Sequence, residues 1–206
     1  MDRPTDCLII MARAPYLGAV KSRLAVTVGD ERALAIYRSL AEHTVAVARA
    51  SRLEVCVAFT PRDALADMRR WLGDGLRQEA QSDGDLGDRM ATAMTREFAR
   101  GAARVVVVGT DCPALTAAIV QAALAALDTA DVVYGPTADG GFYLVGARAA
   151  HPSLFRDVPW SAADTLQVAL ARADDAGLSV ALLPQLRDVD TEADWQWYLD
   201  QPAAPS

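Results

Sequence analysis

Three cations lie in a short loop that follows the first apolar segment of the chain. Residues 13–24 read Arg-Ala-Pro-Tyr-Leu-Gly-Ala-Val-Lys-Ser-Arg-Leu, and they connect an apolar run to a helical segment. Backbone N–H groups at such a turn, with Lys21 and Arg23 beside them, are suited to hold a di- or triphosphate. Lys21 is the only lysine among 20 basic residues, which indicates a position where an arginine does not serve. The competing interpretation is an ordinary surface loop with incidental charges.

Aspartates follow later segments at positions suited to a metal ion. Asp111 comes shortly after four consecutive valines, and Asp188 and Asp190 precede the last expected helix. A carboxylate at the carboxyl end of a central parallel strand can bind Mg²⁺ that bridges phosphate oxygens. Asp190 or Asp188 is the expected second ligand. The alternative is that Asp111, Asp190 or Thr191 only caps a helix.

Two glycine-bearing segments are weaker candidates. Residues 135–143, Gly-Pro-Thr-Ala-Asp-Gly-Gly-Phe-Tyr, predict a hairpin turn, in which Asp139 could also face a ligand. Residues 81–90, Gln-Ser-Asp-Gly-Asp-Leu-Gly-Asp-Arg-Met, either contact a base or sugar or only begin a helix. Cys112 is expected to be a packed residue rather than a nucleophile, because no base lies near it in the sequence.

Strand and helix signals alternate along the chain and would position these loops. Strands are expected at residues 6–12, 53–60, 76–80, 104–108, 131–135, 142–145 and 179–183. Helices are expected at residues 30–50, 62–72, 88–100, 116–127, 162–176 and 191–199.

This order predicts an α/β three-layer sandwich, with a mostly parallel central sheet and helices on both faces. Two strands after residue 131 without a helix between them indicate a small antiparallel insertion. Ligands of such sheets bind outside the carboxyl ends of the strands. Residues 1–200 are expected to form one domain, and residues 201–206 a disordered tail.

Composition narrows the classes of protein. The chain has 206 residues, 52% of them apolar, and a formal net charge of −7. This acidic balance lacks the basic field that nonspecific nucleic-acid binding requires. No apolar run approaches the roughly 20 residues of a membrane span, and the first residues do not resemble a secretory signal. A cytoplasmic protein with neither nucleic-acid nor membrane partners is expected.

Further motifs are absent from the sequence. No Walker A loop exists, no Gly-x-Gly-x-x-Gly follows the first strand, and no Gly-x-Ser-x-Gly elbow occurs. The three cysteines form no Cys-x-x-Cys pair, and neither His43 nor His151 has a metal-ligand neighbour in the sequence. A P-loop phosphotransferase, a dinucleotide site and histidine-based catalysis are therefore not expected.

Six motifs in order resemble the DUF2064 family, whose members are described as glycosyltransferase-like proteins of the nucleotide-diphospho-sugar transferase (GT-A) superfamily. They are K-S-R-L-A, Q-S-D-G-D-L-G-D-R-M, G-T-D-C-P-A-L, G-P-T-A-D-G-G-F-Y-L-V-G, L-F-R-D-V-P-W-S and D-V-D-T. The resemblance extends from about residue 8 to residue 195 and implies a GT-A-like fold. This sequence departs from the family at Arg13, where lysine is common, at Ser82, where glycine is usual, and at Ala162, where threonine is usual.

The loops and the resemblance together imply roles for individual residues, and the resemblance itself implies those of Lys21, Arg23, Asp111, Asp139, Gly140 and Gly141. The catalytic residues would be Lys21, Arg23 and Asp111. The metal, Mg²⁺ or Mn²⁺, would be held by Asp111 and Asp190. The donor nucleotide would be bound by Ala12, Arg13, Gly18, Lys21, Arg23, Gln81, Asp85, Leu86 and Arg89. The acceptor side would consist of Asp139, Gly140, Gly141 and Trp160.

The group that is transferred stays open. The family description favours glycosyl transfer from a nucleotide sugar to a small-molecule acceptor. Many GT-A glycosyltransferases carry an Asp-x-Asp metal motif, however, and Gly109 occupies its first position here. The single Asp111 and the Lys-Ser-Arg-Leu loop also resemble phospholactate guanylyltransferases, which transfer a nucleotidyl group from a triphosphate. A third interpretation is a nucleotide-binding module without catalysis.

Overall fold

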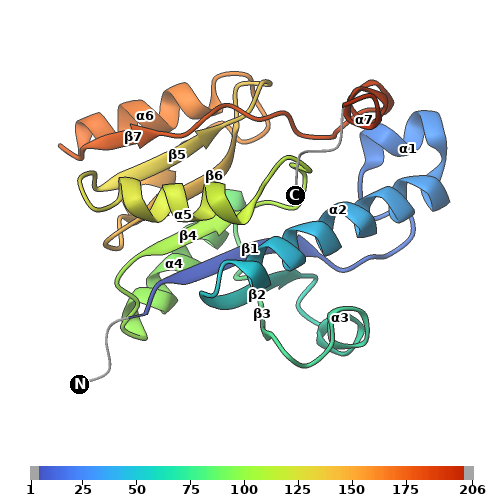
Figure 1. The fold of residues 1–206 in the computed structure, drawn as a ribbon, viewed down its shortest axis with the longest axis horizontal. Coiled ribbons are helices and arrows are strands. Elements are labelled where there is room, and N and C mark those ends of the chain that lie inside the picture. The colour runs from blue at the N-terminus through green and yellow to red at the C-terminus, as the bar shows by residue number, and fades with distance from the viewer. Residues whose placement is uncertain (1–4, 202–206) are drawn as a thin grey trace.

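The computed structural model describes residues 5–201, which contain a seven-stranded sheet with helices on both faces (Figure 1). The strands are β1 (Cys7–Arg13), β2 (Glu54–Thr60), β3 (Arg77–Ala80), β4 (Val105–Val108), β5 (Val132–Pro136), β6 (Phe142–Ala147) and β7 (Val180–Leu182). The helices are α1 (Ser22–Val28), α2 (Asp30–Ala50), α3 (Leu65–Leu72), α4 (Leu86–Ala99), α5 (Ala117–Ala126), the 3₁₀ helix η1 (Pro152–Phe155), α6 (Thr165–Asp175) and α7 (Glu192–Leu199).

The sheet has the strand order β3-β2-β1-β4-β6-β5-β7. All neighbouring strands are parallel except β6, which runs antiparallel to both β4 and β5. Because β5 and β6 are joined by a tight turn, β6 reverses direction and enters the sheet beside β4. The predicted antiparallel insertion and the predicted α/β sandwich are confirmed.

Each face of the sheet is covered by its own helices. Side chains alternate along β1, so that Leu8 and Ile10 pack among residues of α2, α3 and α5. Cys7 and Ile9 point to the other face and pack among residues of α4, α6 and η1. The valines of β4 divide in the same way and are fully buried, which explains why this strand shows an uninterrupted apolar run.

The expected elements agree with the structure, with small shifts at their ends. The helix at residues 30–50 was predicted with its observed bounds. Two short helices, α1 and η1, were not predicted as separate elements. Of the expected tail, residues 202–206 lie outside the described residues. Among residues 5–201, no helix has the length and apolar character that a membrane crossing needs.

A segment after β7 brings distant loops together at one edge of the sheet. The backbone N–H of Leu186 donates to the carbonyl oxygen of Pro136 at the end of β5 (3.0 Å). Three residues later, the N–H of Val189 donates to the carbonyl oxygen of Asp111 after β4 (2.9 Å). The two acids that flank Val189 therefore lie beside the loop that follows the central strand.

Candidate active site

Lys21 connects three loops at this edge of the sheet. Its ammonium nitrogen lies 2.6 Å from Oδ1 of Asp111 and 3.1 Å from Oδ1 of Asp190, and it donates to the carbonyl oxygen of Val189 (2.6 Å). The side chain is 6% exposed, and the backbone is left-handed (φ 49°) where α1 begins. An ammonium has three donors, and here three acceptors surround it. Lys21 thus contacts both carboxylates directly, whereas the sequence analysis expected it to contact donor phosphates.

The charges around Lys21 keep it protonated. Burial alone would lower the pKa of Lys21, but the negative charges of Asp111 and Asp190 outweigh burial and raise this pKa above its ordinary value. Arg23 differs, because its side chain is 66% exposed and its closest carboxylate, that of Asp190, is 3.5 Å away. The guanidinium of Arg23 therefore keeps donors available for a further anion.

Helix capping involves Thr116 and Thr191, and not the two candidate metal ligands Asp111 and Asp190. Thr116 caps α5, since its side chain accepts from the N–H of Ile119, so Asp111 does not serve this purpose. Thr191 caps α7 in a reciprocal arrangement with Asp194, which leaves Asp190 beside Lys21. The alternative explanation is thus wrong for Asp111 and Asp190 and correct for Thr191.

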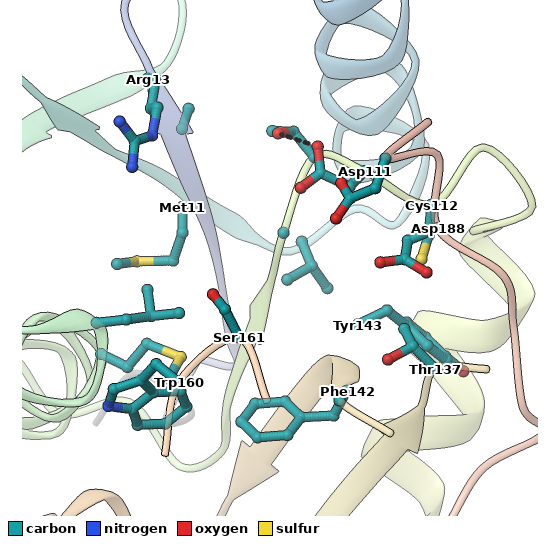
Figure 2. A pocket seen from close by; sticks show the side chains of 18 of the residues that line it. Met11, Arg13, Asp111, Cys112, Thr137, Phe142, Tyr143, Trp160, Ser161 and Asp188 are labelled. Atoms are coloured by element: carbon teal, nitrogen blue, oxygen red, sulfur yellow. Dashed lines mark hydrogen bonds between the residues drawn. The ribbon is translucent and has the colours of Figure 1, made fainter. Parts of the chain in front are cut away.

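One cavity of about 530 Å³ lies above the strand ends, and most predicted residues line it (Figure 2). The predicted residues that line it are Ala12, Arg13, Lys21, Arg23, Gln81, Leu86, Arg89, Asp111, Asp139, Gly141, Trp160 and Asp190. The donor, metal and acceptor predictions thus refer to a single space.

Three predicted residues do not line this cavity. Asp85 caps α4, where its side chain accepts from the N–H of Asp88. Gly18 forms a left-handed turn (φ 72°) near the side chain of Asp30. Gly140 has φ 92°, and a Cβ there would lie 1.9 Å from the carbonyl oxygen of Ala163, so only glycine fits. These positions shape the loops without facing the space where a ligand would lie.

The end of the cavity near β1 and β3 is held by hydrogen bonds. The side-chain amide of Gln81 donates to the carbonyl oxygens of Ala12 (3.2 Å) and Ala58 (2.8 Å). The hydroxyl of Tyr37 accepts from the N–H of Arg13 and donates to its carbonyl oxygen (2.7 Å each). Arg13 is thereby fixed at its backbone while its guanidinium extends along the cavity margin (Figure 2).

Asp188 adds a fourth acid to the cavity beside Asp111, Asp139 and Asp190. Burial raises the pKa of Asp188 to about 6, and the negative charge of Asp139 contributes next. The carboxylates of Asp111 and Asp188 project toward the same space (Figure 2). This end of the cavity thus holds more negative charge than Lys21 and Arg23 can neutralise.

We expect Asp188→Asn to stabilise the metal-free protein at pH 7.5 but not at pH 4. The folded-state pKa of Asp188 lies above the unfolded value of about 3.9, so ionisation destabilises the fold as the pH rises through 4 to 6. Allowing for solvent screening, the gain is about 1 kcal/mol, which corresponds to roughly 2–4 °C in Tm. Thermal unfolding in EDTA at both pH values measures it, with Asp83→Asn, at a 99% exposed carboxylate, as control. Equal Tm differences at both pH values would contradict the assignment.

Another group of potential metal ligands lies away from this cavity. Among the described residues, Cys56, Glu79 and Glu97 form the set of three such side chains whose ligand atoms lie within 4.8 Å of one another. Arg77 and Arg100 already pair with both glutamates, for example Arg100 Nη2 with Glu79 Oε1 at 2.8 Å. This group is a neutralised ion-pair network, which is a poor environment for a further cation.

Sequence reasoning did not identify several residues that line the cavity. Tyr37 lies among the apolar residues of the expected helix at residues 30–50, and Met11 lies within the expected strand at residues 6–12, so both resemble core residues. Thr137 and Ser161 also line the cavity. Ser161 has a left-handed backbone (φ 64°), which the sequence does not reveal, although its neighbour Trp160 was a candidate.

Gly87 lets Trp160 pack closely against α4. A Cβ at Gly87 would lie 2.6 Å from both the carbonyl oxygen of Phe155 and Cζ2 of Trp160. We expect Gly87→Ala to lower the free energy of unfolding by about 1–3 kcal/mol, because backbone and indole must shift. The corresponding fall in Tm is roughly 2–4 °C per kcal/mol. The matched control is Gly75→Ala, where no atom lies within 4 Å of the added Cβ. Equal Tm values for the two variants would disprove the close contact.

The chain has the fold of the nucleotide-diphospho-sugar transferases. Its structure superposes with a TM-score of 0.92 on that of a protein from Desulfovibrio desulfuricans G20, provisionally assigned as a nucleotide-diphospho-sugar transferase, with 32% identity over 98% of this chain and 90% of that chain. The chain belongs to the DUF2064 family, described as "Uncharacterized protein conserved in bacteria", whose model matches residues 43–162. The predicted family is confirmed, although the Lys21 loop and the segment with Asp188 and Asp190 lie outside the matched range.

More distant solved structures share the fold. Rv0371c from Mycobacterium tuberculosis H37Rv, solved in complex with manganese, has a TM-score of 0.60 and 17% identity over 96% of this chain and 100% of that chain. CMP:2-keto-3-deoxy-manno-octonic acid synthetase complexed with CTP has a TM-score of 0.59 and 15% identity over 94% and 96%. No curated protein matches the chain significantly. The prediction of an enzyme of the transferase class agrees with the provisional assignment of the 32% identical protein from Desulfovibrio desulfuricans G20.

Proposed function

We propose that this protein is a metal-dependent transferase that uses a nucleotide-activated donor, with glycosyl transfer from a nucleotide sugar as its reaction. The observation that carries the proposal is the meeting of Lys21, Arg23, Asp111 and Asp190 at one end of one cavity. These residues come from three segments far apart in the sequence, namely the start of α1, the loop after β4 and the segment after β7. Their position outside the carboxyl ends of central strands is where α/β sheets bind ligands.

The donor set of this end of the cavity fits a divalent cation. Mg²⁺ is usually bound by one or two carboxylates together with substrate phosphates and water, so it needs no compact cage of protein ligands. Asp111 is the proposed first ligand, and Asp190 or Asp188 the second. When bound, Mg²⁺ or Mn²⁺ would stabilise the negative charge that develops on the donor phosphates.

The side chains of the chain would have distinct roles. Lys21 would orient Asp111 and Asp190 and neutralise part of their charge. Arg23, with its exposed guanidinium, would hold the donor phosphates. Arg13 and Arg89, with Gln81 between β1 and α4, would bind the nucleoside end. Support comes from the relative solved with manganese and from the one solved with CTP, both of which share the fold.

Nucleotidyl transfer is the second candidate reaction. Gly109 stands where an Asp-x-Asp motif would have its first acid, and no side chain is available there for a metal. Taken alone, Gly109 at this position favours a different reaction, the transfer of a nucleotidyl group from a triphosphate onto a phosphorylated acid. In either reaction, the charged side chains would act mainly by stabilising charge on phosphates.

The released product distinguishes the candidates. The protein is incubated with Mg²⁺ and either nucleoside triphosphates or nucleotide sugars, each with a panel of acceptors. Nucleoside diphosphate release supports glycosyl transfer, whereas pyrophosphate release supports nucleotidyl transfer. Tight Mg²⁺-dependent binding without turnover across the panel supports a binding module and contradicts the proposal.

A further inference from the structure

The cavity has an apolar side beside its charged end. Four side chains of one packed apolar cluster line this side, which we call the apolar chamber: Met11 from β1, Met90 from α4, Phe142 from β6 and Trp160 from the loop before α6. Figure 2 shows Met11, Phe142 and Trp160 around one side of the space, with Asp111 and Asp188 on the other. The chamber therefore opens directly toward the aspartates.

The walls of the chamber are held in place by packing. The ring centroids of Phe142 and Trp160 lie 6.1 Å apart in an edge-to-face arrangement. On its other side, Trp160 contacts Gly87 too closely for any larger residue. Met90 is 4% exposed, whereas Met11, Phe142 and Trp160 are half-buried and present apolar surface to the cavity. Apolar surface kept open within a cleft is typical of a binding surface.

The hydroxyl of Ser161, next to Trp160, points into the cavity beside the apolar chamber. Ser161 has a left-handed backbone (φ 64°), and Figure 2 shows its hydroxyl directed toward the middle of the space. Thr165 holds the adjoining turn, since its hydroxyl donates to the carbonyl oxygen of Pro159 (2.6 Å) and accepts from the N–H of Ala162 (3.3 Å). A left-handed non-glycine residue beside a cavity is often part of a functional arrangement.

We propose that the acceptor is an alcohol with an apolar body, which the apolar chamber binds, and that the Ser161 hydroxyl hydrogen-bonds the alcohol oxygen. This inference rests on the proposed transferase function, because it identifies the second substrate of the same site. A sugar or polyol would bring several hydroxyls against thioether and aromatic side chains, where they would lose their hydrogen bonds to water. An apolar body gains from the same surface.

Binding of two model alcohols tests the proposal without a nucleotide. We expect 2-phenylethanol to bind the wild-type protein with a Kd at least tenfold lower than that of methyl α-D-glucoside, measured by NMR titration. Met11→Gln and Trp160→Leu should each raise the Kd of 2-phenylethanol at least threefold. Leu182→Gln changes an exposed leucine outside the cavity and should leave this Kd unchanged. Ser161→Gly, in which glycine can adopt the same left-handed backbone, should lower the affinity for 2-phenylethanol by a larger factor than the affinity for toluene.

Three results would overturn the inference. The first is a Kd for the glucoside equal to or below that of 2-phenylethanol. The second is a Kd for 2-phenylethanol that neither Met11→Gln nor Trp160→Leu changes. The third is an equal loss of affinity for 2-phenylethanol and for toluene in Ser161→Gly. A further titration with each of the four nucleoside triphosphates and Mg²⁺ locates the base. If Met11→Gln lowers the affinity for a triphosphate by the same factor as the affinity for 2-phenylethanol, the apolar chamber binds the nucleotide base and the inference is wrong. Failure of the proposed function would instead show as absent Mg²⁺-dependent binding of both nucleoside diphosphates and nucleoside triphosphates to the wild type.

Discussion

Asp111→Asn is expected to lower the affinity for a nucleotide in the presence of Mg²⁺ on the order of 100-fold or more, because even residues that only support a metal ligand contribute 10–100-fold. The amide of asparagine carries no negative charge for the cation, and it also leaves Lys21 with one carboxylate instead of two. The fold should persist. The backbone carbonyl oxygen of residue 111, which accepts from Val189, is unchanged by the substitution.

Calorimetric titration with and without Mg²⁺ measures this effect. The matched control is Asp83→Asn, which removes an equal charge from a side chain that is 99% exposed and lies outside the cavity. Circular dichroism establishes that both variants are folded. Unchanged affinity and unchanged metal dependence in Asp111→Asn would remove this residue from the proposed metal site.

Lys21→Ala is expected to lower the affinity for a nucleoside diphosphate about 10–100-fold. The affinity for the corresponding nucleoside should be nearly unchanged. Without the ammonium, Asp111 and Asp190 face each other with no cation between them, and the phosphates meet uncompensated negative charge. Lys21→Arg should also be impaired. A planar guanidinium cannot present its donors to three acceptors around one point as an ammonium does.

Parallel titrations of the diphosphate and the nucleoside test this role. Arg23→Ala provides a comparison. It should lower the affinity for the diphosphate by a smaller factor than Lys21→Ala does, since the side chain of Arg23 is mostly exposed. An equal loss for diphosphate and nucleoside would show that Lys21 does not act on the phosphates. A Lys21→Arg variant that binds the diphosphate as tightly as the wild type would disprove the requirement for an ammonium.

The elements with strong patterns were predictable from the sequence. Helix α2 has 21 residues with apolar side chains at helical spacing, and β4 consists of four valines. The reversal at β6 could be predicted because only a short turn separates it from β5. Helix α1 is different, since it has seven residues and begins at a left-handed lysine, so no periodic pattern spans it.

The site was predictable in its composition but not in its contacts. Ligands of such sheets bind beyond the carboxyl ends of the strands, and this rule predicts that Lys21 and Asp111 line one cavity. Their direct contact depends on a segment 168 residues beyond Lys21, which supplies the carbonyl oxygen of Val189. The raised pKa of Asp188 likewise results from tertiary burial. Local signals do not contain such long-range information.

The central claim is that a divalent cation binds at Asp111, at the charged end of the cavity. Anomalous diffraction from crystals grown with Mn²⁺ and a nucleotide tests it most directly. We predict an anomalous peak in contact with the Asp111 carboxylate and with Asp190 or Asp188. A peak at Cys56, Glu79 and Glu97, or no peak at the cavity, would contradict the account.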